Sequence, residues 1–416
     1  MTTSNSILKA VKKSPGIALV FLVIFVPMTF KLISPVFILA GLGGYTDIIM
    51  PSLLVIGLLL SLRYFASFVK IQDVFFYLFF AVFLFFSPLV YPLSEEFVSD
   101  NYSKFIFQVV PYFFLGLSLR YDRNIDIFRF VSRTGLFIQL FWQFCLLVGL
   151  ADVDRADDGS LGEQMGIAYG FLFSLFLEII YAIEDKRRID IILSIIGTLL
   201  LFFMGTRGPI IVYLFFVAGY LIIVYDFKQN NLIKKLLIGI VAAIIIRSSK
   251  FLLLLIMPFA TSLGFSTRVF DSFLGNEMFE IENSSYRDDF YFGIWSKIIN
   301  DPTYLGYGFG ADRLFTPNGV YTHNFELEIL CQFGIIGGGL IIICLLIMFL
   351  NCYFRLKGTR EVSFWFALLC CGLGSLQLSQ SYISYPLFFV LLGYCISVFR
   401  YSSKTNKSNL YAPIVR

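Results

Sequence analysis

Charged side chains are scarce in this chain of 416 residues, where Lys, Arg, Asp and Glu together make up 14% of the sequence. Soluble globular proteins carry about 25% charged residues, so this composition argues against a water-soluble domain. Histidine is scarcer still, because His323 is the only one. A metal site built from histidine and cysteine is therefore disfavoured, and we predict neither a metal nor another cofactor.

The cysteines avoid the long polar stretch around residues 266–330. All seven lie within or beside apolar runs, at Cys145, Cys331, Cys344, Cys352, Cys370, Cys371 and Cys395. Because the most polar segment has no cysteine, a disulfide framework is not expected.

Apolar residues dominate instead, at 58% of the chain, with 18% aromatic residues. A helix needs about 20 apolar residues to cross a bilayer. The sequence therefore predicts an all-α polytopic membrane helix bundle of about twelve transmembrane helices. The apolar segments are 16–42, 48–62, 73–90, 105–119, 130–150, 164–183, 189–204, 208–225, 235–264, 332–351, 362–378 and 381–399.

The linkers between these segments alternate between basic and acidic. The basic set includes Lys70, Arg120, Lys186, Arg355 and both tails, whereas Glu95, Glu96, Asp100 and Asp152–Asp158 belong to the acidic set. The positive-inside rule then predicts cytoplasmic N- and C-termini. No small-residue cleavage site follows the first apolar run, so we expect it to be a retained first helix. We divide the chain into transmembrane helices at 1–265, a large extracytoplasmic loop at 266–330, and transmembrane helices with a cytoplasmic tail at 331–416.

Within the large loop, residues 284–299 have the pattern of an amphipathic helix. Asn283 or Ser284 can cap its start, and Asn300-Asp301-Pro302 ends it. Its apolar face is predicted to lie on the membrane surface. That face comprises Tyr291, Phe292, Ile294, Trp295, Ile298 and Ile299.

Two arginines of the outer face are candidates for binding an anion. Arg207, in Gly205-Thr-Arg-Gly-Pro209, lies where a helix is expected to start with Pro209 at its first position. Arg287 lies in line with the stripe of Tyr291, Ile294 and Ile298, where a cation needs a partner. Phosphate would satisfy both. Alternatively, Arg207 snorkels to water, and Arg287 pairs with Asp288, Asp289 or a lipid phosphate.

His323 is the candidate general base, although a lone histidine is more often structural. Thr322 is the predicted N-cap of the following helix, which would place the imidazole in the first turn, where the helix dipole disfavours its charged form. A neutral imidazole can accept a proton. Glu326, one turn later, is predicted to orient it.

The run Leu305-Gly-Tyr-Gly-Phe-Gly-Ala-Asp312 imitates a nucleotide-binding fingerprint. No strand precedes it and no helix clearly follows, so a Rossmann site is rejected. A turn is the favoured interpretation, and a close approach of backbone to a ligand is the alternative.

Taken together, these motifs resemble the O-antigen polymerase and ligase superfamily. The resemblance rests on Thr206-Arg-Gly208 and on Arg287 followed by Trp295, Pro302 and Gly306-Tyr-Gly308. It also rests on His323-Asn324 ahead of Gly334-Ile-Ile-Gly337. It covers residues 205–345 or so, and Pro209 departs from it, since a small residue is common there.

The resemblance implies a metal-independent, inverting glycosyltransferase of the bacterial inner membrane with a periplasmic active site. His323, Arg207 and Arg287 would be catalytic, and Asn324, Gly208 and Glu326 would bind substrate. The partners would be undecaprenyl-diphosphate oligosaccharide donor and acceptor, membrane lipid and a chain-length regulator, with no nucleic acid.

Within the superfamily we favour a polymerase that joins oligosaccharide repeats, and the ligase that transfers polymer to lipid A-core is the main alternative. A lipid-oligosaccharide flippase would bury charges near mid-bilayer, yet few charges interrupt the apolar segments. A membrane O-acyltransferase could also use His323.

Overall fold

In a computed structural model, the described residues form helices and turns without a strand. They are residues 71–104, 110–147, 158–204, 206–224, 287–300, 304–316, 319, 321–378 and 381–402, with a few between 52 and 70. The predicted segments at 16–42 and 235–264 and most of 48–62 lie outside them. The chain forms two compact units, one containing residues 126–283 and the other 53–125 and 284–416. Each is described separately.

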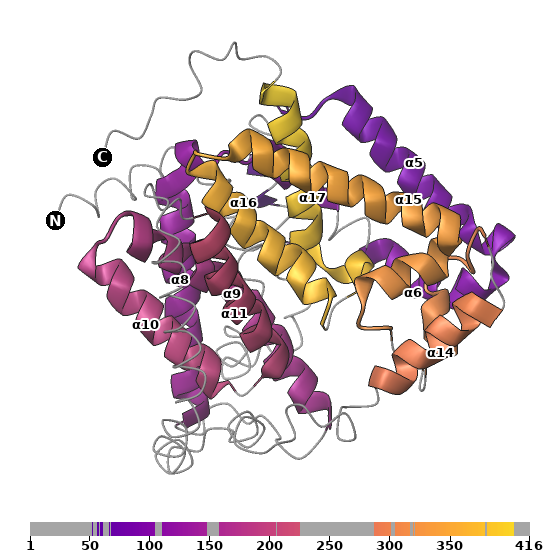
Figure 1. Cartoon of the computed structure of the whole chain (residues 1–416), viewed down its shortest axis with the longest axis horizontal. Coiled ribbons are helices and arrows are strands. Elements are labelled where there is room, and N and C mark those ends of the chain that lie inside the picture. Colours follow the sequence, from indigo (N-terminus) through magenta and orange to yellow (C-terminus); the bar gives the residue numbers. More distant parts are fainter. Residues whose placement is uncertain are drawn as a thin grey trace. The chain divides into compact units, whose positions relative to one another are not determined.

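The first unit is built from antiparallel helices around α9. Its members are α8 (Tyr121–Leu147, from residue 126), α9 (Asp158–Glu184), α10 (Arg188–Phe203) and α11 (Arg207–Gly219), followed by the π-turn η4 (Tyr220–Val224). Both α10 and α11 pack against α9 (Figure 1). Phe176 stacks on Phe216 with ring centroids 3.8 Å apart, and this aromatic contact joins α9 to α11.

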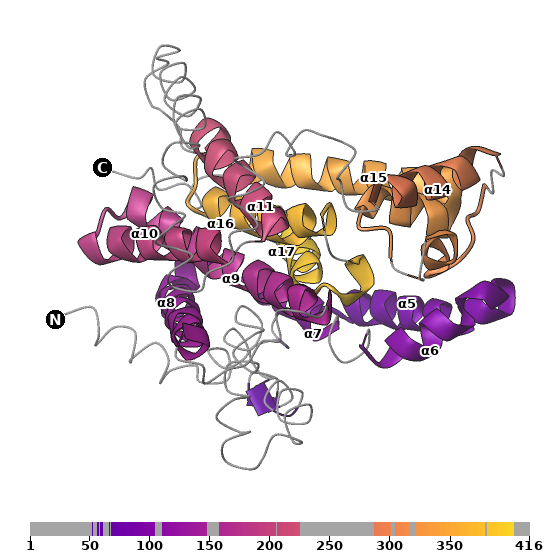
Figure 2. The ribbon, with the colours of Figure 1, turned by 90° about the horizontal axis from the view of Figure 1, so that it is seen from below.

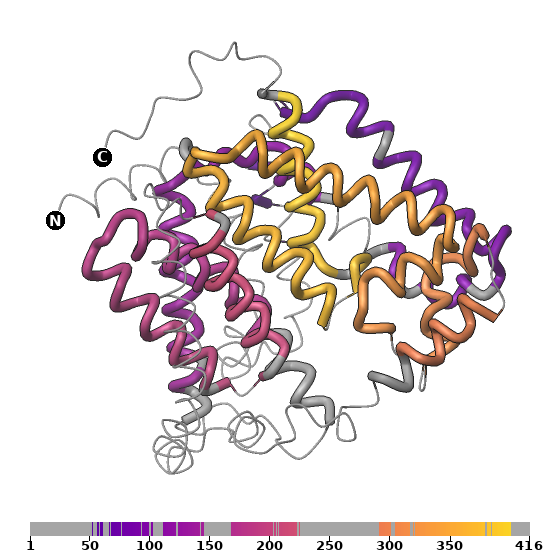
Figure 3. The backbone as a smooth tube through the Cα atoms, in the orientation of Figure 1, coloured from indigo at the N-terminus to yellow at the C-terminus, as the bar shows by residue number. Residues whose placement is uncertain are grey.

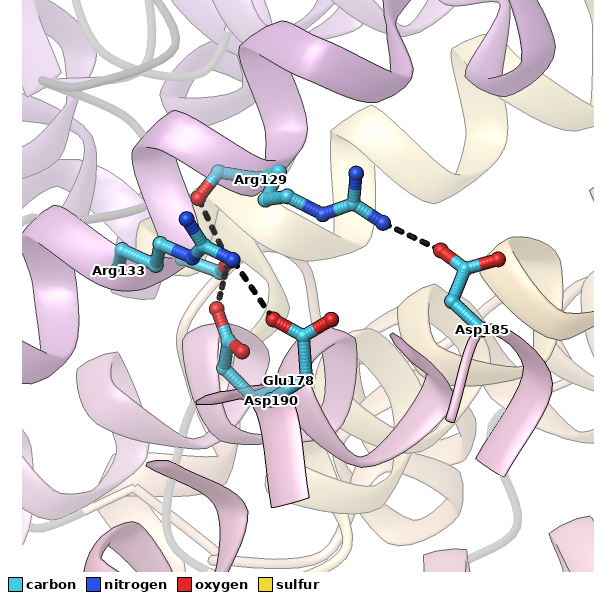
Figure 4. Close-up of polar contacts among 6 residues, drawn as sticks. Arg129, Arg133, Glu178, Asp185 and Asp190 are labelled. Carbon is cyan, nitrogen blue, oxygen red and sulfur yellow. Dashed lines mark hydrogen bonds and ion pairs between the residues drawn. The ribbon is translucent and has the colours of Figure 1, made fainter. Parts of the chain in front are cut away.

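Ion pairs join three helices at one end of this unit (Figure 4). Arg129 of α8 pairs with Asp185 just after α9, and its guanidinium lies 4.6 Å from the Tyr181 ring. Arg133 Nη2 lies 2.7 Å from Oδ1 of the fully buried Asp190 at the start of α10. Each arginine therefore has an acidic partner. The pairs hold α8 against the turn between α9 and α10.

The second unit contains the rest of the described helices. These are α5 (Ile71–Val90), η2 (Pro92–Ser94), α6 (Glu95–Lys104), α7 (Val110–Ser118), α14 (Arg287–Asn300), η7 (Ala311–Phe315), α15 (Phe325–Leu356), α16 (Glu361–Leu369) with the π-turn η9 (Cys370–Gly374), η10 (Tyr382–Ser384) and α17 (Pro386–Ser402). α5 runs beside α6, and α14 lies against the start of α15 (Figure 2).

Glycines allow the closest helix contact, between α7 and α17. A Cβ atom on Gly116 would come within 2.2 Å of Val390 O, and one on Gly393 would come equally close to Phe113 O. Small residues at a crossing let two backbones approach, which is the usual way helices pack in lipid.

The glycine-rich run packs against a break in α15. Gly334 has φ 74° and ψ 175°, so the helix is interrupted there. The freed carbonyls of Cys331 and Gln332 accept hydrogen bonds from the backbone N–H groups of Tyr307 and Gly308, both at 3.0 Å. A Cβ on Gly306 would lie 2.3 Å from Gln332 O. The glycines thus permit contact between two backbone segments. The run therefore forms a turn, as predicted, and its backbone closely approaches the backbone of α15.

Contacts within the second unit join its linkers at two places. At one end, Arg400 of α17 pairs with Asp73 of α5, and Arg120 Nη1 donates to Ser397 Oγ at 2.6 Å. At the other end, Tyr91 Oη donates to Leu305 O at 3.3 Å. The basic linkers therefore meet at one end, and an acidic linker meets the large loop at the other. Which end faces the cytoplasm stays a prediction.

Among the described helices, α5 and α15 are long and apolar enough to cross a membrane. In their most apolar stretches only 24% and 17% of residues are buried, and their exposed side chains are mostly Phe, Leu, Ile and Val. Every apolar segment predicted between residues 73 and 225 and after 332 contains a helix. Several are shorter than a bilayer requires, α7 with nine residues most clearly, so the twelve-span count stays a prediction.

Candidate functional site around His323

His323 lies just before α15 in a conformation that is rare for a residue with a side chain. Its φ is 54°, in the left-handed region, which costs an L-residue roughly 1–2 kcal/mol. The predicted N-cap was wrong, because Asn324 caps α15 by accepting a hydrogen bond from Leu327 N at 3.0 Å. The imidazole therefore precedes the helix instead of lying in its first turn.

Thr322 does not cap the helix because Asp312 takes its polar groups. Asp312 Oδ2 accepts from Thr322 N at 3.1 Å and from Thr322 Oγ1 at 2.8 Å. Both residues are fully buried. On the other side of His323, Tyr291 Oη donates to the His323 carbonyl at 3.3 Å. These contacts hold the backbone of His323 from both sides, and such support is what a strained conformation requires.

The carboxylate of Asp312 belongs to a larger buried network. Its Oδ1 accepts from Gln332 Nε2 at 2.8 Å, and Gln332 Oε1 accepts from Tyr382 Oη at 2.6 Å. Ser381 Oγ donates to Glu328, which is also buried. The network joins the large loop to the segment before α17.

The predicted surface helix is α14, which ends at Asn300 as expected. Its apolar face is split into two. Ile294 and Ile298 are buried against Cys331 of α15, whereas Phe292, Trp295 and Ile299 are exposed. Only the second stripe is available to a membrane surface. The described residues between α14 and α15, 304–316 and 321–324, belong to the orange part of the tube in Figure 3.

The first residue of α14 is Arg287, four residues before Tyr291. Because Tyr291 contacts His323, the start of α14 lies beside the candidate base. The Arg287 side chain and the predicted caps Asn283 and Ser284 lie outside the described part. The structure thus brings the backbone of one candidate arginine towards His323.

Arg207 and Gly208 belong to the first unit, so their joining this site stays a prediction. Thr206 is the N-cap of α11, and the helix begins at Arg207. Pro209 is therefore its third residue instead of its first, still within the turn whose N–H groups have no helical partner. The side chain of Arg207 lies outside the described part.

Asn324 and Glu326 already have contacts within the protein. The Asn324 side-chain oxygen is used in capping. Glu326 Oε1 accepts from Gln377 Nε2 at 2.6 Å, which is a different partner from the predicted imidazole. Their roles in substrate binding stay predictions.

Two neighbouring residues, Asp312 and Arg313, were missed by sequence reasoning. The Arg313 guanidinium lies 4.7 Å from the Phe97 ring and 5.9 Å from the Tyr321 ring. Tyr321 in turn lies 4.2 Å from the His323 ring, measured between centroids. The one available signal was an Asp-Arg pair directly after the glycine-rich run. Within the described residues, no group of three His, Cys, Asp or Glu side chains is arranged as metal ligands.

No family model matches the chain, and neither a curated protein nor a solved structure shows significant similarity to it.

Proposed function

We propose that the protein is a polysaccharide polymerase that joins undecaprenyl-diphosphate-linked oligosaccharide repeats at the periplasmic face of a bacterial inner membrane. The observation that carries the proposal is the held, left-handed conformation of His323 beside the start of α14. A strained backbone supported on both sides is a common feature of functional sites.

The chemistry is an inverting displacement at the anomeric carbon of the donor sugar. An imidazole nitrogen of His323 takes the proton of the acceptor hydroxyl and later releases it to water. The hydroxyl oxygen forms a bond to the anomeric carbon as the bond from that carbon to the diphosphate oxygen breaks. The electron pair leaves with the diphosphate, whose charge is stabilised by arginine.

The membrane location is supported by two features. The described helices α5 and α15 are long, apolar and mostly exposed, as lipid-facing helices are. Basic linkers meet at the end of the second unit opposite to His323, and by the positive-inside rule this supports a position of His323 outside the cytoplasm.

Deleting the gene and analysing the lipopolysaccharide tests the activity. We expect core that carries a single repeat, because transfer to core continues without polymerisation. Bare core with lipid-linked polymer accumulating would contradict the proposal and identify a ligase. Unchanged lipopolysaccharide would contradict both.

Orientation can be tested with an impermeant thiol reagent on intact spheroplasts. We expect Tyr304→Cys, in the exposed loop, to react and Lys357→Cys, after α15, not to react. The unmodified chain is the control, because Cys344 is exposed. Labelling of Lys357→Cys alone would reverse the orientation and remove the proposed site from the periplasm.

A further inference from the structure

Arg313 differs from other half-buried arginines of the described structure in what surrounds its charge. Arg120, Arg133, Arg355 and Arg400 each donate to an oxygen of the protein. The Arg313 guanidinium makes no ion pair or side-chain hydrogen bond with a described residue. It is held by the ring of Phe97 instead. A guanidinium stacked on a ring keeps its N–H edge available for an anion in its own plane.

The adjacent carboxylate does not neutralise this arginine. Asp312 is fully buried, and its two oxygens accept from Thr322 and Gln332. Asp312 and Arg313 are thus sequence neighbours whose charged groups serve different contacts. Arg313 is partly exposed. Arg313 interacts electrostatically with the buried Glu328, yet no described carboxylate pairs directly with its guanidinium, so its hydrogen-bond donors remain available to an external anion.

The position of Arg313 relative to His323 limits which anion it can serve. Tyr321 contacts both side chains, at 5.9 Å from the Arg313 guanidinium and 4.2 Å from the imidazole. In an inverting transfer the base and the leaving group lie on opposite sides of one anomeric carbon. The reaction involves two diphosphates, one on the donor lipid and one on the acceptor lipid. Only the donor's diphosphate is attached to the reacting anomeric carbon, because the acceptor's diphosphate lies several sugars away from the attacking hydroxyl. A cation one aromatic ring away from the base is therefore placed to contact the donor's diphosphate.

We propose that Arg313, held by Phe97 and flanked by Tyr321, binds the diphosphate leaving group of the lipid-linked donor. The assignment rests on the proposed glycosyl transfer and adds a third arginine to the two predicted from sequence. Arg313 makes the planar, two-pronged contact with phosphate oxygens that lysine cannot make.

Binding to the purified full chain in detergent tests this site. The probes are farnesyl diphosphate, farnesyl monophosphate and inorganic phosphate, measured by calorimetry. Arg313→Gln is expected to raise the Kd for farnesyl diphosphate about 10–100-fold, and Arg313→Lys by less. Arg355→Gln is the matched control, because Arg355 also lies 4.7 Å from an aromatic ring, that of Phe399, but at the other end of α15. Its Kd should equal that of the wild type.

The outcomes separate this site from the function on which it rests. An unchanged Kd in Arg313→Gln, or no binding by the wild type, overturns the site. Equal affinity for the diphosphate, the monophosphate and inorganic phosphate overturns the diphosphate assignment and indicates a general anion site. Equal competition by phosphatidylglycerol vesicles overturns it in favour of a lipid headgroup.

Polymer formation from lipid-linked repeats is measured on the same preparations. If the Arg313→Gln variant polymerises repeats at the wild-type rate and binds the diphosphate with the wild-type Kd, the proposed function stands and the Arg313 site is rejected. If the wild type binds the diphosphate and Arg313→Gln does not, but the wild type forms no polymer, the Arg313 site is supported and the proposed function is rejected. Thermal unfolding of Arg313→Gln, expected within a few degrees of wild type, shows that a loss of binding is not a loss of fold.

Discussion

Buried charge has different partners at the helix junction of the first unit and in the network before α15 of the second, although the second unit also holds an ion pair between Arg400 and Asp73. In the first unit, Arg129 and Arg133 each contact an acidic side chain across a helix boundary. In the second, buried Asp312 is satisfied by a backbone N–H, a hydroxyl and an amide. Arg313 next to it packs on aromatic rings.

This difference separates charges that join helices from charges arranged for chemistry. A paired charge has its partner already, and breaking the pair leaves a buried ion that destabilises the fold. A cation held by an aromatic ring keeps its hydrogen-bond donors available to a ligand. Substitutions in the first unit should therefore lower stability, and those around His323 should lower the rate.

The largest expected effect is on catalysis. His323→Ala should lower the rate of glycosyl transfer about 10²–10⁴-fold while the protein still inserts and binds lipid-linked donor, because only the base is removed. His323→Gln should be equally inactive, since the amide is polar but not basic. Single-turnover rates and donor binding on purified protein measure both. Near-normal polymer from either variant would reject the base, and loss of donor binding would make His323 a binding residue.

The next effect is on stability in the first unit. Arg129→Gln should lower the free energy of unfolding by about 3–5 kcal/mol, because the buried ion pair with Asp185 is broken. The double variant with Asp185→Asn should lose less. Arg188→Gln, at an exposed position on α10, is the control. Thermal unfolding in detergent measures all three, and an unchanged midpoint for Arg129→Gln would remove the contrast between the units.

Gly334→Ala tests the break in α15. Its backbone conformation is one that essentially only glycine adopts, and a Cβ would lie 2.3 Å from Tyr304 O, so a loss of at least about 1–3 kcal/mol is expected. Gly339→Ala has no atom within 4 Å of the new Cβ and should be neutral or stabilising. Equal unfolding midpoints for the two variants would mean that the loop does not pack against the break.

Asp312→Asn should lower kcat about 10–100-fold, because the amide has only one oxygen and cannot accept from both Thr322 and Gln332, which loosens the support of the His323 backbone. Donor affinity should be nearly unchanged, since Asp312 is buried and does not face the ligand. Steady-state kinetics with lipid-linked repeats separates kcat from KM. A rise in KM alone would assign Asp312 to binding instead of positioning.

The smallest effect is expected at Glu326. Glu326→Gln should change the rate by less than about twofold, because Gln377 donates to Glu326 Oε1 and an amide oxygen can accept the same bond. The same kinetic assay measures it. A large loss would restore the role in substrate binding or histidine orientation that the sequence predicts.

Helix positions could be predicted well from local pattern. Apolar runs indicated α5, α9, α10 and α15, and the Asn300-Asp301-Pro302 sequence indicated the end of α14. These are properties of a chain segment and its solvent, so neighbouring residues carry the information. The topology derived from the alternation of linker charge stays a prediction.

The details at the site depended on residues distant in sequence. Thr322 and Asn324 are both good N-caps, and local pattern could not choose between them. Asp312, ten residues earlier, binds Thr322 and leaves Asn324 to cap the helix. This choice moves His323 out of the helix and into its left-handed conformation.

By itself, then, the sequence determined an all-helical, apolar chain whose single histidine lies in a polar loop before a long helix. Only the tertiary structure decided that Gly334 breaks that helix and that Arg313 rests on Phe97 beside Tyr321. The physical reason is that helix formation follows local composition and hydrogen bonding. The partner of a buried charge, in contrast, is chosen by whichever distant segment packs against it.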